Sequence, residues 1–447
     1  MILDKKTLIS VLILLIMGLM AYATSIFLNI FVSNYITPEL YGDFTLTIRS
    51  LNLISAFLLL GSGFVSIKYL SKYISNKEND YVICFISWNL KLILKTSILC
   101  IILCAILFAV IYILHILNVK DLSSYHHVAY TLWLAPFAAF ASLLCCYLLS
   151  IKKRKLFFVM EQIAQQLFLL LIFCIAIFFF DIKLEFSSII LIVFFVLLII
   201  ITIESVSLSN LFKNYIKERK NVILQTQPGW MQDSLKFIFS NMIYAIMCAI
   251  DLYIIEIFHK NEAGVGHYSA ILAIGSILVL TIPKATSTIL KPKIFTMICN
   301  NKHQELKKLT HSIIFINIIS LTPVLLVIII FPKSILGFFG AEYSSAYLPL
   351  IIVSISYFFA GVIQPSAILL FYINATKGVK IDALQLLLTV CLGIPFTCMW
   401  GLLGISISVA IALTLSVLYK YVSAIKEMEK LQRRSTITDV FLETNEQ

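Results

Sequence analysis

Apolar residues run along the chain in long stretches, which short clusters of charge, proline and glycine separate. Most stretches reach about 20 residues, the length that a helix needs to cross the hydrocarbon core of a bilayer. Breaking the chain at the clusters predicts twelve helices, with limits near 8–34, 43–67, 88–115, 128–150, 156–180, 186–212, 235–258, 266–290, 311–331, 347–371, 380–399 and 402–420. The strict alternation that a membrane barrel requires is missing, so the pattern favours helices.

Composition supports the same assignment. Hydrophobic residues make up 60% of the 447 residues, charged residues only 13%, and the mean hydropathy is +0.99, whereas soluble domains carry about 25% charged residues. We therefore expect an all-α integral membrane protein. The ten cysteines are scattered through apolar stretches and indicate small core residues rather than a disulfide framework or a metal site. We expect no cofactor and no catalytic residues, and therefore no enzyme.

Lysine and arginine concentrate in every second loop, beginning at the amino terminus, and the intervening loops hold only Lys120, Lys183, Lys260 and Lys333. Because positive charge accumulates on the cytoplasmic side, both termini are predicted to be cytoplasmic. The net charge of +11 is thus explained by membrane orientation, and no nucleic-acid partner is expected. Tryptophans near predicted span ends are typical of interface anchors; these are Trp88, Trp133, Trp230 and Trp400.

A short internal repeat relates the two halves of the chain. Gly42, Phe44 and Thr45 before the second predicted span correspond to Gly266, Tyr268 and Ser269 before the eighth, half the chain length further on. Six spans per half give both halves the same orientation, as in transporters built from parallel repeats. This predicts an amino-terminal six-helix lobe over 1–220, a carboxy-terminal six-helix lobe over 221–420, and a polar cytoplasmic tail over 421–447.

Several segments of the chain resemble the polysaccharide flippases of the multidrug/oligosaccharidyl-lipid/polysaccharide exporter superfamily. They lie at 37–44 (TPELYGDF), 60–63, 249–270, 290–294 (LKPKI), 338–350, 374–380 (NATKGVK) and 401–408 (GLLGISIS). The resemblance implies two pseudo-symmetric six-helix lobes around a central cavity and transport by alternating access in a bacterial plasma (inner) membrane. One departure is that Leu252 follows Asp251, where the family often has Asp-Arg.

The resemblance also implies the cargo, namely a lipid-linked O-antigen or capsule repeat unit used in lipopolysaccharide or other polysaccharide biosynthesis. Expected partners are this lipid-linked oligosaccharide, membrane lipids, and a polysaccharide polymerase together with other glycan-assembly proteins. The sugar-pyrophosphate head would cross through a polar cavity while the polyprenyl tail stays in the bilayer. A polar cavity lowers the cost of moving the head because fixed hydrogen bonds and charges replace its water.

Charged residues inside the predicted spans are candidates for this cavity, since each costs at least about 2.5–3.5 kcal/mol near the bilayer centre without a partner or water. Arg49 shares a helix face with Asn52 and is predicted to bind substrate, with a structural role as partner of Asp43 or of a neighbouring helix as the alternative. Asp251 lies at a matching depth in the second half. Arg49 and Asp251 are therefore predicted to pair across the lobes as a gate, with a structural role for Asp251 in span seven as the alternative.

Three further residues complete the predicted sites. Lys284 near the inner end of the eighth span would attract the lipid pyrophosphate, because ammonium groups bind phosphate oxygens; the alternative is a lysine that extends to the interface. Gln364, next to Pro365 in the tenth span, is predicted to line the cavity at a bend. Glu161 is assigned to gating or coupling, against simple solvation of the inner end of span five.

Two other functions remain open. A cation-coupled drug or small-molecule antiporter could share the fold and would favour buried carboxylates. A membrane polysaccharide polymerase would need charged groups in a sizeable loop, whereas the loops here are short.

Overall fold

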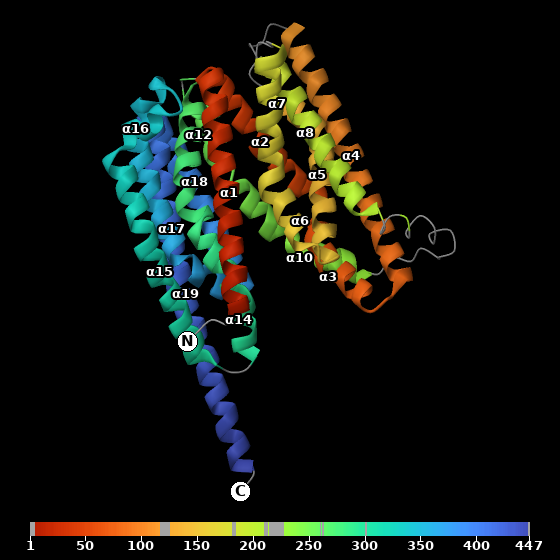
Figure 1. Ribbon diagram of the computed structural model, residues 1–447, viewed down its shortest axis with the longest axis vertical. Helices are drawn as coiled ribbons and strands as arrows, with labels where there is room; N and C mark the ends of the chain where they lie inside the picture. Colours follow the sequence, from red (N-terminus) through yellow and green to blue (C-terminus); the bar gives the residue numbers. More distant parts are fainter. Residues whose placement is uncertain are drawn as a thin grey trace. The chain divides into compact units, whose positions relative to one another are not determined.

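The computed structural model describes residues 5–116, 126–180, 185–209, 213, 228–259, 261, 263–299 and 302–445. All regular elements in this part of the chain are helices (Figure 1). Ten of them are long and apolar enough to cross a membrane, or up to twelve spans are present if each of two bent helix pairs counts as one. The prediction of an all-α integral membrane protein with twelve spans is confirmed.

Contacts divide the chain into two compact units. The continuous unit comprises Ile36–Ala249, and the discontinuous unit comprises Met1–Tyr35 together with Ile250–Gln447. The first helix therefore groups with the carboxy-terminal helices, and the seventh span contributes one half to each unit. Because these units follow contacts rather than chain order, the lobe boundary near residue 220 stays a prediction.

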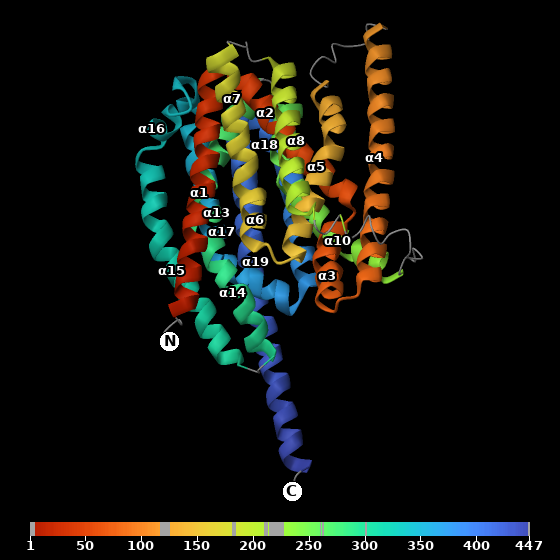
Figure 2. The ribbon, with the colours of Figure 1, turned by 45° about the vertical axis from the view of Figure 1, so that its right-hand side comes forward.

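The continuous unit contains five spans and one half-span. Its helices are α2 (Pro38–Leu59), α3 (Ser62–Ser75), α4 (Asn79–Ile116), α5 (His126–Ser150), α6 (Arg154–Val159), the π-helical turn η2 (Met160–Ala164), α7 (Gln165–Phe180), α8 (Phe186–Ser207) and α10 (Pro228–Met247). Helix α5 is the centre of this bundle, since it packs against α2, α3, α4 and α8 (Figure 2). Its alanines and leucines are mostly buried, so neighbouring backbones can approach it closely.

The second span is broken where α2 meets α3. The two helices differ in direction by 55°, and Leu60 and Gly61 at the junction both have positive φ, of 47° and 77°. The Leu60 carbonyl accepts a hydrogen bond from Ser234 Oγ at 2.5 Å, which satisfies an acceptor that the break leaves outside the helical ladder. The sequence pattern predicted a single span over 43–67. The break was not expected, since apolar residues continue through it.

The discontinuous unit consists of α1 and the remaining helices. These are α1 (Lys5–Tyr35), α11 (Ile250–Phe258), α12 (Gly264–Gly275), α13 (Ile277–Leu280), α14 (Ile282–Cys299), α15 (His303–Ile330), α16 (Pro332–Gly337), the 3-10 helix η4 (Ala341–Ala346), α17 (Tyr347–Ile373), α18 (Ala375–Trp400) and α19 (Leu402–Asn445). Helix α17 packs against α14, α15 and α19, while α1 lies along α12, α13 and α14 (Figure 1). The Tyr22 hydroxyl donates to the carbonyl oxygens of Ala273 and Ile274, at 3.2 and 3.3 Å, and so fixes α1 to α12.

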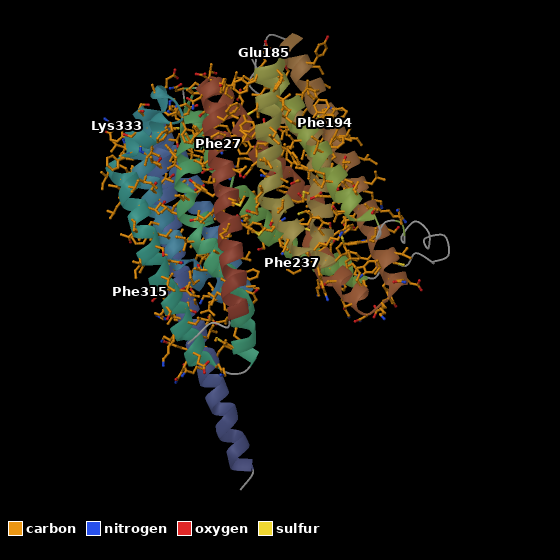
Figure 3. The ribbon with its side chains drawn as sticks, viewed as in Figure 1. Phe27, Glu185, Phe194, Phe237, Phe315 and Lys333 are labelled. Atoms are coloured by element: carbon orange, nitrogen blue, oxygen red, sulfur yellow. The ribbon has the colours of Figure 1, made fainter. Side chains whose placement is uncertain are left out.

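Large apolar side chains cover the outer faces of several helices, as expected for contact with lipid. Phe315 of α15 is 63% exposed and points away from its helix in Figure 3. Trp133 and Trp400 are also about half exposed, at 53% and 51%, which suits interface anchors. The same interpretation is wrong for Trp230, because this side chain is completely buried.

Candidate functional site

A polar pocket lies inside the continuous unit, with a volume of about 260 Å³. That volume can hold several water molecules, since each occupies about 30 Å³ in the liquid. The pocket lies between α2, α5, the α6–η2–α7 stretch and α8. The lining residues are Leu51, Asn52, Ala138, Ala141, Ser142, Cys145, Cys146, Phe157, Met160, Glu161, Gln165, Leu197, Ile200 and Glu204.

Helix α2 supplies one wall of the pocket. Thr37 caps the helix by accepting a hydrogen bond from the Leu40 amide, and Pro38 occupies the first turn, where no amide donor is needed. From this start the helix carries Arg49, which is half-buried, and the exposed Asn52 on one face. Asn52 lines the pocket, whereas Arg49 lies outside the lining.

The fifth span supplies the opposite wall through a local change in helix type. Residues Met160–Ala164 form a π-helical turn between two α-helical segments. Such a turn inserts one residue into the helical repeat and is frequent at functional sites. It places Glu161 and Gln165 in the lining, and Glu161 is exposed there.

Glu204 of α8 is the residue that the sequence analysis missed. Its side chain is 1% exposed, lines the pocket, and its Oε2 has no hydrogen-bond partner among the described residues. It is also the only charged residue of α8. Its signal in the sequence was a lone acid within the predicted span 186–212, on the same helix face as Leu197 and Ile200.

The charges of α2 and the fifth span act on a common neighbour in α10. Both Arg49 and Glu161 influence the phenol of Tyr244 electrostatically, with opposite sign, and Cys248 forms a side-chain hydrogen bond with it. Arg49, Glu161 and Tyr244 therefore share one polar region of the continuous unit. The structure thus brings together three of the predicted site residues, since Asn52 belongs to the same pocket.

Asp251 lies in the other unit, at the start of α11. Its side chain is 7% exposed, and its Oδ1 accepts a hydrogen bond of 2.9 Å from the Leu252 amide. A carboxylate in the first turn of a helix is stabilised by the unpaired amides and the dipole there. This favours a structural role at the start of α11. Pairing of Asp251 with Arg49 across the two units stays a prediction.

Lys284 and Gln364 also belong to the discontinuous unit. Lys284 is half-buried in the first turn of α14. Gln364 lies in α17 before Pro365, and its Oε1 is buried without a hydrogen-bond partner within the described residues. Next to them, Asn317 of α15 links α14 to α17, because it contacts Thr286 Oγ1 at 3.2 Å and donates to the Gly361 carbonyl at 3.0 Å. Binding of substrate by these residues stays a prediction.

Solved transporter structures share this fold. An inward-facing multidrug resistance MATE family transporter of the MOP superfamily aligns with a TM-score of 0.71 at 13% identity, over 92% of this chain and 95% of that chain. The Vibrio cholerae MATE transporter VcmN in its bent form gives 0.56 at 14% identity, over 95% and 97%. A Pyrococcus furiosus transporter of the MOP superfamily, whose binding pocket is described as having reverse polarity, gives 0.63 at 11% identity, over 96% of both chains.

The fold is therefore the one that these solved MOP-superfamily transporters share. The family model for polysaccharide biosynthesis proteins matches residues 7–297, more than half of the chain, and the chain belongs to this family. No curated protein sequence matches the chain.

Proposed function

We propose that this protein moves a polyprenyl-pyrophosphate-linked oligosaccharide from the cytoplasmic to the outer leaflet of the bacterial plasma membrane by alternating access. The family match over residues 7–297 carries this proposal, because it places a transporter fold within polysaccharide biosynthesis. A lipid-linked repeat unit is the intermediate of such pathways that has to cross a membrane. The step is a translocation without covalent chemistry, so the protein is proposed not to be an enzyme.

Cationic residues on membrane helices support an anionic cargo. Arg49 and Lys284 are both half-buried and bring positive charge to helices of the membrane-spanning part. Guanidinium and ammonium groups form charge-assisted hydrogen bonds to phosphate oxygens. In the proposed cycle Arg49 and Lys284 bind the pyrophosphate, while Asn52 and Gln364 bind hydroxyl groups of the sugars.

Complementation tests the proposal in cells. The gene is expressed in a strain that lacks its own repeat-unit flippase and whose glycan chemistry matches, and surface glycan is measured beside the amount of membrane-inserted protein. Wild type should restore the glycan. Arg49→Ala and Lys284→Ala each remove a charge-assisted hydrogen bond of about 1.5–3 kcal/mol, so the rate of glycan appearance should fall about tenfold or more.

Lys302→Ala is the matched control, since this lysine is exposed and pairs with Glu305 at 3.2 Å away from the proposed site. It should behave as wild type. Equal restoration by wild type and by both site variants would refute the assignment of Arg49 and Lys284, and no restoration by a well-inserted wild type would refute the cargo.

A cation-coupled drug antiporter is the second candidate. Two observations favour it: the MATE transporters that share the fold, and the two carboxylates, Glu161 and Glu204, in one polar pocket. Such a protein would confer resistance to lipophilic cations and leave the glycan defect unchanged. The same strains therefore discriminate the two functions.

A further inference from the structure

Glu204 is buried without the partners that a carboxylate needs. Only 1% of the side chain is exposed, and its Oε2 has no hydrogen-bond partner among the described residues. The side chain that does hydrogen-bond to it is Cys145. That thiol also lies 3.8 Å from the Phe157 carbonyl oxygen, and its single proton can serve only one of the two acceptors at a time.

The cost of burying a charge and the gain from a hydrogen bond together determine the protonation state of Glu204. Burying an ionised carboxylate costs several kcal/mol even after the protein relaxes, whereas one hydrogen bond returns only about 1 kcal/mol. The charged groups nearby do not offset this cost. Lys153 reaches the end of α8, but its ammonium group donates to the Ser207 carbonyl oxygen at 2.8 Å. The neighbouring helices α2, α5, η2 and α7 bring Cys145, Cys146 and the acidic Glu161 to the pocket, while Arg49 stays outside its lining. The neutral acid is therefore the form that the buried position of Glu204 stabilises.

The pocket also provides a route by which the proton can leave. It has room for several waters, and Glu161 is exposed at the pocket. When water reaches Glu204, its O–H bond breaks, the electron pair stays on the carboxylate, and a water molecule takes the proton as hydronium. The negative charge of Glu161 attracts that hydronium toward bulk water.

The immediate contact of Glu204 favours a proton over a metal cation. An alkali cation needs several oxygen ligands, and thiol sulfur is a soft ligand that suits soft metals. The side chain that hydrogen-bonds to Glu204 is the Cys145 thiol, whereas the other oxygen groups of the pocket come from Asn52, Ser142, Glu161 and Gln165. We propose that Glu204 binds a proton in its buried position and releases it when water reaches the carboxyl group, so that this pocket couples proton movement to transport. The role rests on the protein being a transporter and holds for either candidate cargo.

Carbodiimide labelling tests the proton site without any cargo. Dicyclohexylcarbodiimide reacts with protonated carboxylic acids in apolar surroundings, and the full-length protein in membrane vesicles can be labelled and mapped by mass spectrometry. An exposed carboxylic acid is protonated in only about one molecule in 500 at pH 7. Glu204 should therefore be labelled more than about tenfold faster than an exposed glutamate, and its labelling should fall as the pH is raised.

Glu185 is the matched control because it lies at the other end of the same helix and is exposed (Figure 3). Glu204→Gln should abolish the label, and Glu185→Gln should leave it unchanged. Labelling of Glu204 no faster than that of Glu185 would overturn the proposal. Protection by sodium chloride but not by potassium chloride would overturn the proton assignment in favour of a sodium site.

Transport measurements complete the test. In complementation, Glu204→Gln should lower the rate of transport about tenfold or more, whereas Glu204→Asp should retain part of it and Glu185→Gln all of it. A Glu204→Gln variant that is as active as wild type would refute the coupling role. The labelling result does not depend on the proposed cargo. Glu204 can be labelled as expected in a protein that moves no lipid-linked oligosaccharide, and a protein that moves this cargo can fail to show the label.

Discussion

At the scale of single residues, aromatic packing around Trp230 is the contact whose loss should be most costly. Its ring is completely buried and lies 5.2 Å from the Phe85 ring and 5.7 Å from the Trp88 ring. The indole Nε1–H donates to the Tyr73 hydroxyl at 3.0 Å. One side chain of α10 thus holds α3 and α4 together by packing and by a hydrogen bond.

Trp230→Ala should destabilise the continuous unit by about 3–5 kcal/mol, the usual cost of removing a large buried aromatic ring. The thermal unfolding of the purified protein in detergent measures this, with Trp133→Ala as control. Trp133 is 53% exposed, so its removal should leave the unfolding temperature nearly unchanged. A similar shift for both variants would contradict the structural role of Trp230.

The sequence predicted residue types better than residue environments. It identified Arg49, Asn52 and Glu161 as polar groups in apolar helices, and the structure gathers them in one region of the continuous unit. It could not separate Trp230 from the interface tryptophans, because burial of Trp230 depends on α3 and α4, which are distant in sequence. Glu204 is marked in the sequence only as a lone acid in a predicted span, and its burial against Cys145 depends on α5, which is distant in sequence.

At the scale of elements, the helix limits agree with the spans predicted from the apolar pattern, whereas the bends were not predicted. The limits of α5, α8 and α17 agree with the predicted spans to within a few residues. The break at Leu60 and Gly61 depends on a contact between helices: a Cβ atom added to Gly61 would lie 2.4 Å from the Ser234 carbonyl oxygen. A single-span pattern carries no information about that contact.

Gly61→Ala should therefore be strongly destabilising. The substitution places a side chain at a φ of 77°, which costs about 1–2 kcal/mol, and forces α3 away from α10. Gly18→Ala in α1 is the matched control, because nothing lies within 4 Å of the added Cβ and alanine favours a helix by about 1 kcal/mol. Unfolding temperatures of the two variants measure the difference, and equal stability would contradict the bend as described.

At the scale of the whole molecule, the distribution of lysine and arginine predicts the orientation in the membrane. A green fluorescent protein fused after Gln447 should fluoresce, since it folds in the cytoplasm, and alkaline phosphatase fused at the same place should be inactive. Alkaline phosphatase inserted after Lys333, an exposed residue of a predicted outer loop, should be active. Activity of the phosphatase at the terminus but not after Lys333 would reverse the topology.

The division into units also belongs to this scale. Helix α1 groups with residues Ile250–Gln447, although the internal repeat predicted sequential halves. Chain order alone gives no reason for α1 to group with the carboxy-terminal helices. It arises from contacts such as those of Tyr22 with the backbone of α12, which a periodic pattern cannot predict.

Translocation in a purified system tests the central claim most directly. The protein is reconstituted into liposomes with a fluorescent polyprenyl-pyrophosphate oligosaccharide, and a membrane-impermeant glycosidase or quencher reports which leaflet holds the sugar. We predict protein-dependent exchange of the sugar head between leaflets, which speeds up under a proton gradient and slows in Arg49→Ala. Liposomes in which the sugar stays in its original leaflet, while the same protein exchanges a lipophilic cation for protons, would contradict the account.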